Sequence, residues 1–339
     1  MRSLACTSPG TFDFIDETMP VKKPGDAILQ VKRIGICGTD LHAYEGTQPY
    51  FEYPRILGHE LSAVIVDVDE TSGFIKDEIV TIMPYFNCGH CIACRRNKPN
   101  CCANIKVFGV HIDGGMREFI SIPEDKLIKS EGLNLDELAL AEPLAIGAHA
   151  VKRAAAEPNE FVLVVGAGPI GIGIMELARM AGARVIAMDT NEDRLTFCNK
   201  QLNVEHILNP LKEDVLTKLK DITHNDMPTV VFDATGNLNA INNGINYLAH
   251  GGRYVLVGLQ KEDFHFSHPE FHKRETTLMS SRNATKDDFI YVIQNLKKSL
   301  IQPGNYITHR TSFNEISSSK FDYWINPQHK VIKAMVSFG

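Results

Sequence analysis

Hydrophobic and polar positions divide the chain into parts of different periodicity. Short apolar runs of the β type occupy residues 1 to about 145 and include residues 27–36, 63–68 and 78–83. Proline and glycine interrupt these runs, and no long helical period precedes Leu135. Short runs between turn residues are typical of β-strands. The first part is therefore predicted to be an irregular all-β lobe.

Strands and helices begin to alternate near residues 145–160. An Ala- and Leu-rich segment, residues 135–153, is predicted to be helical and leads into this part. The predicted strands are residues 161–165, 184–188, 229–233, 253–257 and 277–279. The predicted helices between them run to about residue 181, onward from residue 191 and across residues 239–248. Such alternation predicts an α/β fold with a parallel, doubly wound sheet.

The alternation ends after Arg282. Residues 284–300 have the apolar spacing of a helix, and residues 306–313 and 331–338 have the composition of strands. The chain is therefore predicted to return to the first lobe at its C-terminal end.

Composition and charge narrow the possible functions. A length of 339 residues favours two domains, and 44% hydrophobic with 22% charged residues is ordinary for a globular protein. The net charge of −6 argues against a general binder of nucleic acid or anionic membranes. The longest apolar stretch, residues 161–175, contains four glycines and is shorter than the ~20 residues of a membrane span. Because the N-terminus lacks a basic-then-apolar signal sequence, the cytoplasm is the expected location.

A glycine-rich motif follows the first strand of the alternating part. It reads Gly166-Ala-Gly168-Pro-Ile170-Gly171 and precedes a predicted helix. Gly166 permits a tight turn, Gly168 lets the backbone approach a pyrophosphate, and Gly171 lets helix and strand pack closely. The helix N-terminus adds free N–H groups. Strand, motif and helix together predict a dinucleotide-binding site at this turn. Ile170, which lies within the motif, is included among its candidate residues.

Asp189 indicates which dinucleotide binds. It ends the second predicted strand, 18 residues beyond Gly171, where a carboxylate can accept hydrogen bonds from both ribose hydroxyls of NAD. The extra phosphate of NADP would meet this charge, at a cost on the order of 4 kcal/mol per unit charge at ~4 Å. Arg194 leaves two alternatives open, since it could stack on adenine or soften the rejection of NADP.

Four cysteines form a cluster with short, regular gaps: Cys88, Cys91, Cys94 and Cys102. Thiols so close together, without an export signal, are typical of metal ligands. Zinc closes a four-sulfur set tetrahedrally and leaves no open position for chemistry, so this site is predicted to be structural. Cys101, beside the last ligand, remains an alternative fourth ligand.

A second set of metal-binding residue types is dispersed: Cys37, His59, Glu60 and Glu142. Each alone could be a core thiol, a satisfied polar residue or an acid at a helix start. Their combination with a dinucleotide site changes this interpretation. One thiolate, one imidazole, one carboxylate and a water form an open zinc site suited to catalysis.

Together these motifs resemble the zinc-dependent medium-chain dehydrogenases, over essentially the whole chain. The resemblance rests on GICGTDLH, GHE, the cysteine cluster, Glu142-Pro143 and GAGPIG, which have the family's order and spacing. Within this family, the chain resembles the sorbitol and threonine dehydrogenase branch, in which a Glu replaces a second cysteine at the catalytic zinc. Two departures affect no ligand: Ala63 replaces a usual Gly, and Asp77-Glu78 replaces a usual Gly-Asp.

The resemblance implies a domain organisation. Residues 1–146 and 283–339 would form a GroES-like β catalytic domain, with a structural zinc lobe at residues 86–103. A Rossmann NAD-binding domain, residues 147–282, would be inserted between them. The family also implies two Zn²⁺ ions per subunit, NAD, a small-molecule substrate, and a homodimer or homotetramer.

The resemblance further implies the ligands of the catalytic zinc. Cys37 and His59 would be two of them. Glu60 would be the third, and Glu142 would exchange for it or hold the zinc-bound water. Which of the two carboxylates binds the zinc at rest stays open.

The implied reaction is hydride transfer from a secondary alcohol of a sugar acid or polyol to NAD. Thr39 and His42 match the family's proton relay, although His42 could be an ordinary loop histidine. Arg282 matches an arginine that faces substrate in the sorbitol branch, where its guanidinium could hold a carboxylate. It could instead be a surface arginine or contact the cofactor phosphates. Several polar and aromatic residues after Cys37 favour a substrate with several hydroxyls: Tyr44, Glu45, Gln48 and Tyr50.

Two competing hypotheses use the same sequence features. A zinc-free quinone or enoyl reductase of the same fold would lack the set Cys37, His59 and Glu60. A zinc-binding protein that has lost catalysis would be expected to lack ligands, and here every expected ligand is present.

Overall fold

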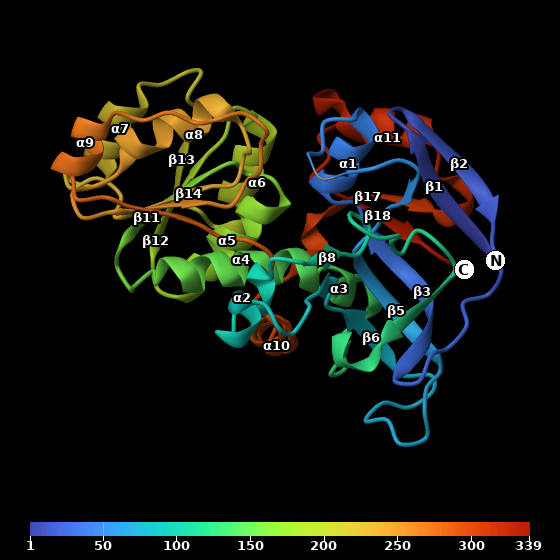
Figure 1. Ribbon diagram of the computed structural model, residues 1–339. Coiled ribbons are helices and arrows are strands. Elements are labelled where there is room, and N and C mark those ends of the chain that lie inside the picture. The colour runs from blue at the N-terminus through green and yellow to red at the C-terminus, as the bar shows by residue number, and fades with distance from the viewer. Residues whose placement is uncertain (50) are drawn as a thin grey trace. The chain divides into compact units, whose positions relative to one another are not determined.

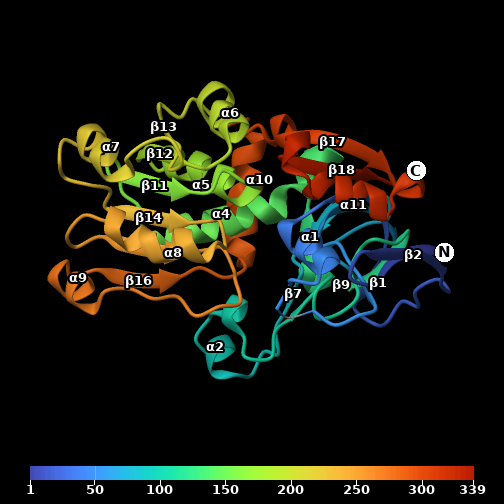
Figure 2. The same cartoon turned by 90° about the horizontal axis from the view of Figure 1, so that it is seen from above.

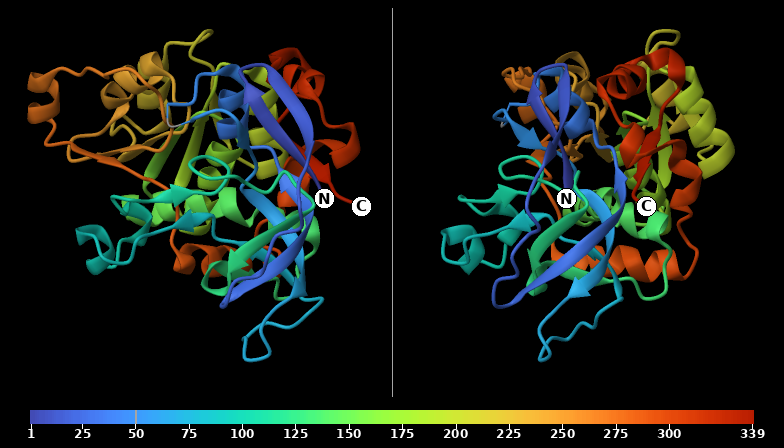
Figure 3. Two further views of the ribbon diagram at one scale, coloured as in Figure 1. Left: turned by 45° about the vertical axis from the view of Figure 1, so that its right-hand side comes forward. Right: turned by 90° about the vertical axis from the view of Figure 1, so that its right-hand side faces the viewer.

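The computed structural model describes residues 1–49 and 51–339 and divides into two compact units. The first unit comprises residues 1–145 and 284–339, and the second comprises residues 146–283 (Figure 1). Both chain ends lie in the first unit (Figure 3). The C-terminal residues after the alternating part thus complete the unit that the N-terminal residues begin.

A seven-stranded sheet forms the centre of the first unit. Its order is β10-β6-β5-β3-β18-β17, and β9 pairs with β3. The C-terminal strand β18 is antiparallel to β3, with Met335 opposite Gly35. The strands are β3 (Asp26–Gly35), β5 (Glu60–Asp67), β6 (Ile79–Ile82), β9 (Phe119–Pro123), β10 (Leu127–Lys129), β17 (Ile307–Ser312) and β18 (Lys333–Ser337).

The core of the first unit follows the alternation of its strands. In β3, the side chains of Leu29 and Val31 are fully buried two positions apart. The register with β5 shifts between Val31 and Arg33. After this irregularity Ile34 and Ile36 carry the buried face, because an extra residue turns the side chains that follow to the opposite face.

Other elements of the first unit surround this sheet. A smaller sheet has the order β2-β1-β4, and a two-stranded ribbon joins β7 to β8. These strands are β1 (Arg2–Ser8), β2 (Thr11–Asp16), β4 (Arg55–Ile56), β7 (Tyr85–Phe86) and β8 (Lys106–Val107). The helices are α1 (Gly38–Glu45), α2 (Ile92–Arg95), α3 (Leu135–Ala139), α10 (Lys286–Lys297) and α11 (Ser318–Ile325). Helix α4 (Ala141–Ala154) begins in the first unit and ends in the second.

The prediction of an all-β first part is wrong at α1. This helix begins directly after Cys37 and ends at Gly46, which adopts a left-handed conformation with φ of 76°. Its sequence, GTDLHAYE, has no stripe of apolar side chains, so hydrophobic periodicity does not reveal it. The carboxylate of Asp40 accepts a hydrogen bond from the backbone N–H of Cys37 (2.9 Å) and stabilises the start of the helix.

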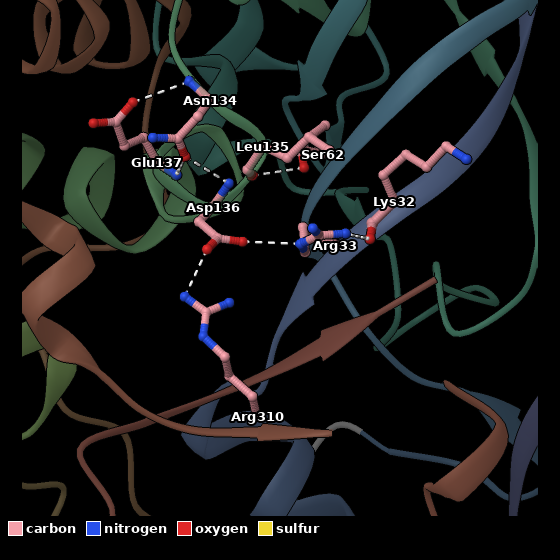
Figure 4. Close-up of polar contacts among 8 residues, drawn as sticks. All are labelled: Lys32, Arg33, Ser62, Asn134, Leu135, Asp136, Glu137 and Arg310. Carbon is pink, nitrogen blue, oxygen red and sulfur yellow. Dashed lines mark hydrogen bonds and ion pairs between the residues drawn. The ribbon is translucent and has the colours of Figure 1, made fainter. Parts of the chain in front are cut away.

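Asp136 links three elements of the first unit (Figure 4). It lies in α3, and its two oxygens accept hydrogen bonds from Arg33 of β3 (2.9 Å) and Arg310 of β17 (2.6 Å). Burial would raise the pKa of Asp136, but the two guanidinium groups hold it below its usual value. Ser62 of β5 donates to the carbonyl oxygen of Leu135 (2.7 Å). These contacts fix α3 against the sheet, immediately before the helix that carries Glu142.

The second unit contains a six-stranded sheet in which every pairing is parallel. Its order is β13-β12-β11-β14-β15-β16, so chain order reverses beside β11 as in doubly wound nucleotide-binding sheets. Helices α5, α6 and α8 pack against these strands (Figure 2). The strands are β11 (Phe161–Val165), β12 (Arg184–Met188), β13 (His206–Leu208), β14 (Val230–Asp233), β15 (Arg253–Leu256) and β16 (Thr277–Ser280). The helices are α5 (Pro169–Met180), α6 (Glu192–Leu202), α7 (Val215–Ile222), α8 (Leu238–Gly244) and α9 (His268–Lys273).

Candidate functional site

Strand pairing brings the GICGTDLH and GHE motifs together. β3 ends at Gly35, which lies opposite Glu60 at the start of the antiparallel strand β5. Cys37 follows β3 and His59 precedes β5, so both lie at the same end of this pair. One ligand atom each from Cys37, His59 and Glu60 lies within 4.8 Å of the others. Three predicted ligands from two separate motifs therefore form one cluster.

Asp40 fixes the backbone around this cluster. It is buried, and its carboxylate accepts hydrogen bonds from the N–H groups of Cys37 (2.9 Å) and Gly58 (3.3 Å). One of its oxygens also lies 3.8 Å from Nδ1 of His59. Burial raises the pKa of Asp40, although the nearby imidazole opposes this. Sequence reasoning gave Asp40 no role, because Asp40 meets Gly58 and His59 only when the fold brings the two motifs together.

Lys333 holds Glu60. Its ammonium group donates to both carboxylate oxygens of Glu60 (2.8 and 2.6 Å) and to the carbonyl oxygen of Ile36 (3.0 Å). Both side chains are fully buried. Burial alone would lower the pKa of Lys333, but Glu60 and Cys37 raise it above its usual value. Glu60 is thus shared between a buried cation and the candidate metal cluster.

Glu142 is a second carboxylate near this cluster, because the charges of His59 and Glu60 act on it, but it is not among the three residues whose ligand atoms lie within 4.8 Å of one another. It lies in the first turn of α4, is 1% exposed, and accepts a hydrogen bond from the hydroxyl of Tyr85. Burial raises the pKa of Glu142 to about 7, and the charge of Glu60 adds to this shift. Tyr85 and Lys333 are contacts that the sequence alone did not indicate.

Two unpaired buried atoms test whether zinc fits this site. Among the described residues, neither Nδ1 of His59 nor Oε2 of Glu142 has a hydrogen-bond partner. A buried polar atom without a partner costs free energy, and a cation or its bound water would supply the missing contact at a carboxylate oxygen. Sulfur, nitrogen and carboxylate oxygen are also the donor atoms that zinc prefers. The residues present fit an open zinc site.

The cysteine cluster lies in the excursion between β7 and β8. The distances between its sulfur atoms include 3.5 Å for Cys91–Cys94, 3.8 Å for Cys91–Cys102 and 3.5 Å for Cys88–Cys102. A tetrahedron with metal–sulfur bonds of ~2.3 Å has edges of about 3.8 Å, so these spacings fit zinc. The neighbouring Cys101 is exposed and lies outside the cluster.

Thr39 and His42 occupy α1. His42 is exposed, and its Nδ1 lies 3.3 Å from both a carboxylate oxygen of Glu45 and the hydroxyl of Thr47. Exposure lets His42 exchange protons with water, as the relay hypothesis requires. Thr39 lies three residues earlier, in the first turn of the helix.

The glycine motif forms the turn between β11 and α5. Gly166 has a φ of 101°, a conformation that residues with side chains rarely adopt. A Cβ at Gly171 would lie 1.8 Å from the carbonyl oxygen of Gly166, so no side chain fits there. Gly168 is the N-cap of α5, and Ile170 lies in its first turn. These positions leave a bare helix N-terminus of the type that binds phosphate groups.

Asp189 faces this turn from the end of β12. Its carboxylate accepts hydrogen bonds from the N–H groups of Ala167 (2.6 Å) and Asn191 (2.8 Å). A guanidinium nitrogen of Arg194 lies 3.9 Å from the place of a Cβ at Gly168. Both residues proposed to choose between NAD and NADP therefore lie beside the glycine turn.

The residues proposed for substrate binding belong to different units of the structure. Arg282 is exposed and follows β16 in the second unit. Tyr44 is buried, and its hydroxyl donates to Asp322 (2.8 Å), so that side chain belongs to the core of the first unit. Tyr50 lies outside the described residues.

The two departures from the family pattern lie in backbone elements. Ala63 is fully buried within β5, and Asp77 has a positive φ of 66° in a turn. Within residues 1–49 and 51–339, no helix combines the length and apolar character that crossing a membrane requires.

Comparison with known proteins identifies both units. The family model of the alcohol dehydrogenase GroES-like domain matches residues 23–132, and the zinc-binding dehydrogenase model matches residues 169–298. L-Galactonate-5-dehydrogenase of Escherichia coli (strain K12) is 40% identical over 339 residues, which cover 100% of this chain and 99% of that protein. A zinc-type alcohol dehydrogenase-like protein of Haemophilus influenzae is 35% identical and covers 97% of this chain and 96% of its own length.

A solved structure extends the likeness to a dinucleotide complex. It is the crystal structure of an alcohol dehydrogenase (rspB) from Escherichia coli CFT073 complexed with NADH. It has a TM-score of 0.91 and 29% sequence identity, and the alignment covers 100% of this chain and 99% of that one. With its GroES-like domain and its Rossmann-type parallel sheet, the chain belongs to the zinc-dependent alcohol dehydrogenase family of oxidoreductases.

Proposed function

We propose that this chain oxidises a secondary alcohol of a sugar acid, at C5 of a hexonate such as L-galactonate, with NAD as the hydride acceptor. The cluster of Cys37, His59 and Glu60 carries the proposal of a zinc-dependent mechanism. Glu142 supports it, because its buried Oε2 is unpaired and the charges of His59 and Glu60 act on this carboxyl group. The substrate class rests on the 40% identity to L-galactonate-5-dehydrogenase over the whole chain. A second zinc, at Cys88, Cys91, Cys94 and Cys102, would stabilise the fold of the lobe.

The protein residues divide the work of the reaction. Cys37 and His59 would hold zinc, together with Glu60 or Glu142. When bound, zinc acidifies the substrate hydroxyl and NAD accepts the hydride. Thr39 would pass the released proton onward, and exposed His42 would deliver it to solvent. Asp40 keeps the loops of Cys37 and His59 in place.

Assembly and location follow from the family resemblance as further proposals. We propose a homodimer or homotetramer in the cytoplasm. Light scattering coupled to size-exclusion chromatography would measure the oligomeric state.

Asp189 is expected to set the preference for NAD. Replacing Asp189 by Ser and Thr190 by Arg removes the carboxylate and adds a cation for the 2′-phosphate of NADP. With a like-charge cost on the order of 4 kcal/mol, the ratio of kcat/KM for NADP to that for NAD should rise by about a thousandfold. Steady-state kinetics with each cofactor measure this ratio. Asp221→Ser removes an exposed carboxylate of α7; it is the control and should leave the ratio unchanged. A wild-type enzyme that uses both cofactors equally would contradict this role of Asp189.

Arg282 is expected to distinguish acids from uncharged sugars. A guanidinium holds a carboxylate through two parallel hydrogen bonds, which a lysine ammonium cannot reproduce. Arg282→Lys should therefore raise KM for hexonates by at least about tenfold, whereas KM for hexitols should change little. Equal losses on both substrates would rule out this role.

An activity screen tests the whole proposal. Zinc-loaded protein, NAD and a panel of hexonates, hexitols and threonine are combined, and NADH absorbance is followed. L-Galactonate is expected to give the highest kcat/KM. A preference for sorbitol or threonine would overturn the substrate class, and no activity on any alcohol would favour a zinc-binding protein without catalysis.

A further inference from the structure

The two oxygens of Glu142 have different surroundings. Oε1 accepts a hydrogen bond from the Tyr85 hydroxyl. Oε2 is buried and has no hydrogen-bond partner among the described residues. A carboxylate can exchange its oxygens by rotating about its terminal bond, so some contact must select the one that faces outward. Tyr85 is the described residue that donates a hydrogen bond to Oε1.

Tyr85 is held rigidly enough to make this selection. Its backbone lies in β7, opposite Val107 of β8. Tyr85 is 4% exposed, and its ring packs in a T-shaped arrangement against the ring of Phe289 of α10, with 6.4 Å between the ring centroids. Strand pairing and the contact with Phe289 therefore restrain the ring, and the hydroxyl is directed at Glu142. A tyrosine hydroxyl carries its proton at neutral pH and can donate it to a carboxylate oxygen.

We propose that Tyr85 is a positioning residue for the catalytic zinc site, which holds Oε1 of Glu142 so that Oε2 is left to contact the zinc or its bound water. The proposal rests on the zinc-binding role of Glu142 in the proposed function. It goes beyond that function because it answers which oxygen of Glu142 acts, and through which contact. A hydrogen bond to a metal-binding carboxylate fixes its orientation and tunes its basicity.

The position of Tyr85 also connects the two candidate metal sites. β7 and β8 form the base of the lobe, and Cys88 follows Tyr85 by three residues. Folding of the lobe around its own metal would therefore act on the strand that carries Tyr85. Removal of the lobe metal should therefore disturb Glu142, although Glu142 binds no atom of the lobe in this scheme.

The variant Tyr85→Phe tests the proposal, because it removes the hydroxyl and keeps the ring that packs against Phe289. We expect the affinity of zinc for the site of Cys37, His59 and Glu60 to fall by about 10- to 100-fold, the usual range for lost outer contacts of metal ligands. Competition with a chromophoric chelator measures this affinity without any substrate. Cobalt placed in the same site should show a changed visible absorption spectrum.

Two further variants separate positioning from general stability. Tyr254→Phe removes another buried tyrosine hydroxyl, which donates to the carbonyl oxygen of Ile241 (2.9 Å) in the second unit, and should alter neither zinc affinity nor cobalt spectrum. If Tyr85 acts through Glu142, then Tyr85→Phe should weaken zinc binding no further in a protein that already carries Glu142→Gln.

Two results would overturn the positioning role of Tyr85. A Tyr85→Phe protein with wild-type zinc affinity and cobalt spectrum would overturn the proposal. A full additional loss in the double variant would also overturn it, because Tyr85 would then act independently of Glu142. Since both readouts concern metal binding, they stand even if the substrate proves not to be a hexonate.

Discussion

Replacing His59 by alanine is expected to abolish turnover while dinucleotide binding persists. His59 is 5% exposed and contributes one of three ligand atoms that lie within 4.8 Å of one another. A metal acting as a Lewis acid supplies several kcal/mol of transition-state stabilisation, so its loss should lower kcat by at least about a thousandfold. The glycine turn belongs to the other unit, and therefore NADH affinity should stay within about twofold. Cys37→Ser should behave in the same way.

Three measurements check this expectation: steady-state turnover, zinc content and NADH binding by fluorescence titration. His309→Ala, on β17 of the same unit, replaces a histidine that lies outside the candidate zinc cluster and should keep full activity. If a zinc-depleted His59→Ala protein turned over substrate normally, the zinc mechanism would be wrong. If NADH binding were lost together with turnover, the separation between the two sites would be wrong.

The Rossmann-type unit was the easier part to predict from the sequence. The first two strands, Phe161–Val165 and Arg184–Met188, have the predicted boundaries. Parallel strands are covered on both faces and appear as continuous apolar runs, which glycine turns delimit clearly. The short strand β13 and helix α7 escaped prediction. Strand β13 has only three residues, which carry too little pattern. Helix α7 has apolar residues at helical spacing, Val215, Leu219 and Ile222, but the segment is only eight residues long and was not recognised.

In the first unit, local pattern predicts less because the structure depends on pairing between distant segments. β1 and β2 form a hairpin that hydropathy did not mark, and α1 lacks an apolar stripe. The candidate ligands could still be found, since their residue types are unusual in combination. Their supporting contacts could not, because Asp40, Tyr85 and Lys333 are ordinary residues until the fold brings them to His59, Glu142 and Glu60.

The sequence around Lys333 contains one signal of a buried ion pair. It interrupts the apolar segment Val331–Phe338, which was itself predicted as a strand. Lysine is almost never fully buried without a partner, so a lysine inside a buried strand demands a buried acid. The sequence does not say which acid this is. The register of β18 against β3, and of β3 against β5, brings Glu60 to it.

Lys333→Met is expected to destabilise the first unit strongly when zinc is absent. The ammonium group contacts both oxygens of Glu60, and its removal leaves a fully buried carboxylate without that cation. Breaking one side of a buried ion pair costs about 3–5 kcal/mol. Zinc should restore part of the loss, because a bound cation beside Glu60 offsets the same charge. Urea unfolding with chelator and with added zinc, followed by the fluorescence of the single tryptophan, Trp324, measures both effects.

A matched control and a double variant make this expectation specific. Lys298→Met removes an exposed lysine from the same unit and should shift stability by no more than about 0.5 kcal/mol. Replacing Lys333 and Glu60 together by methionine removes both buried charges, so in chelator the double variant should be more stable than Lys333→Met alone. Equal urea midpoints for Lys333→Met and Lys298→Met would show that the pair contributes little. A double variant weaker than the single one would show that Glu60 stabilises the fold through contacts other than Lys333.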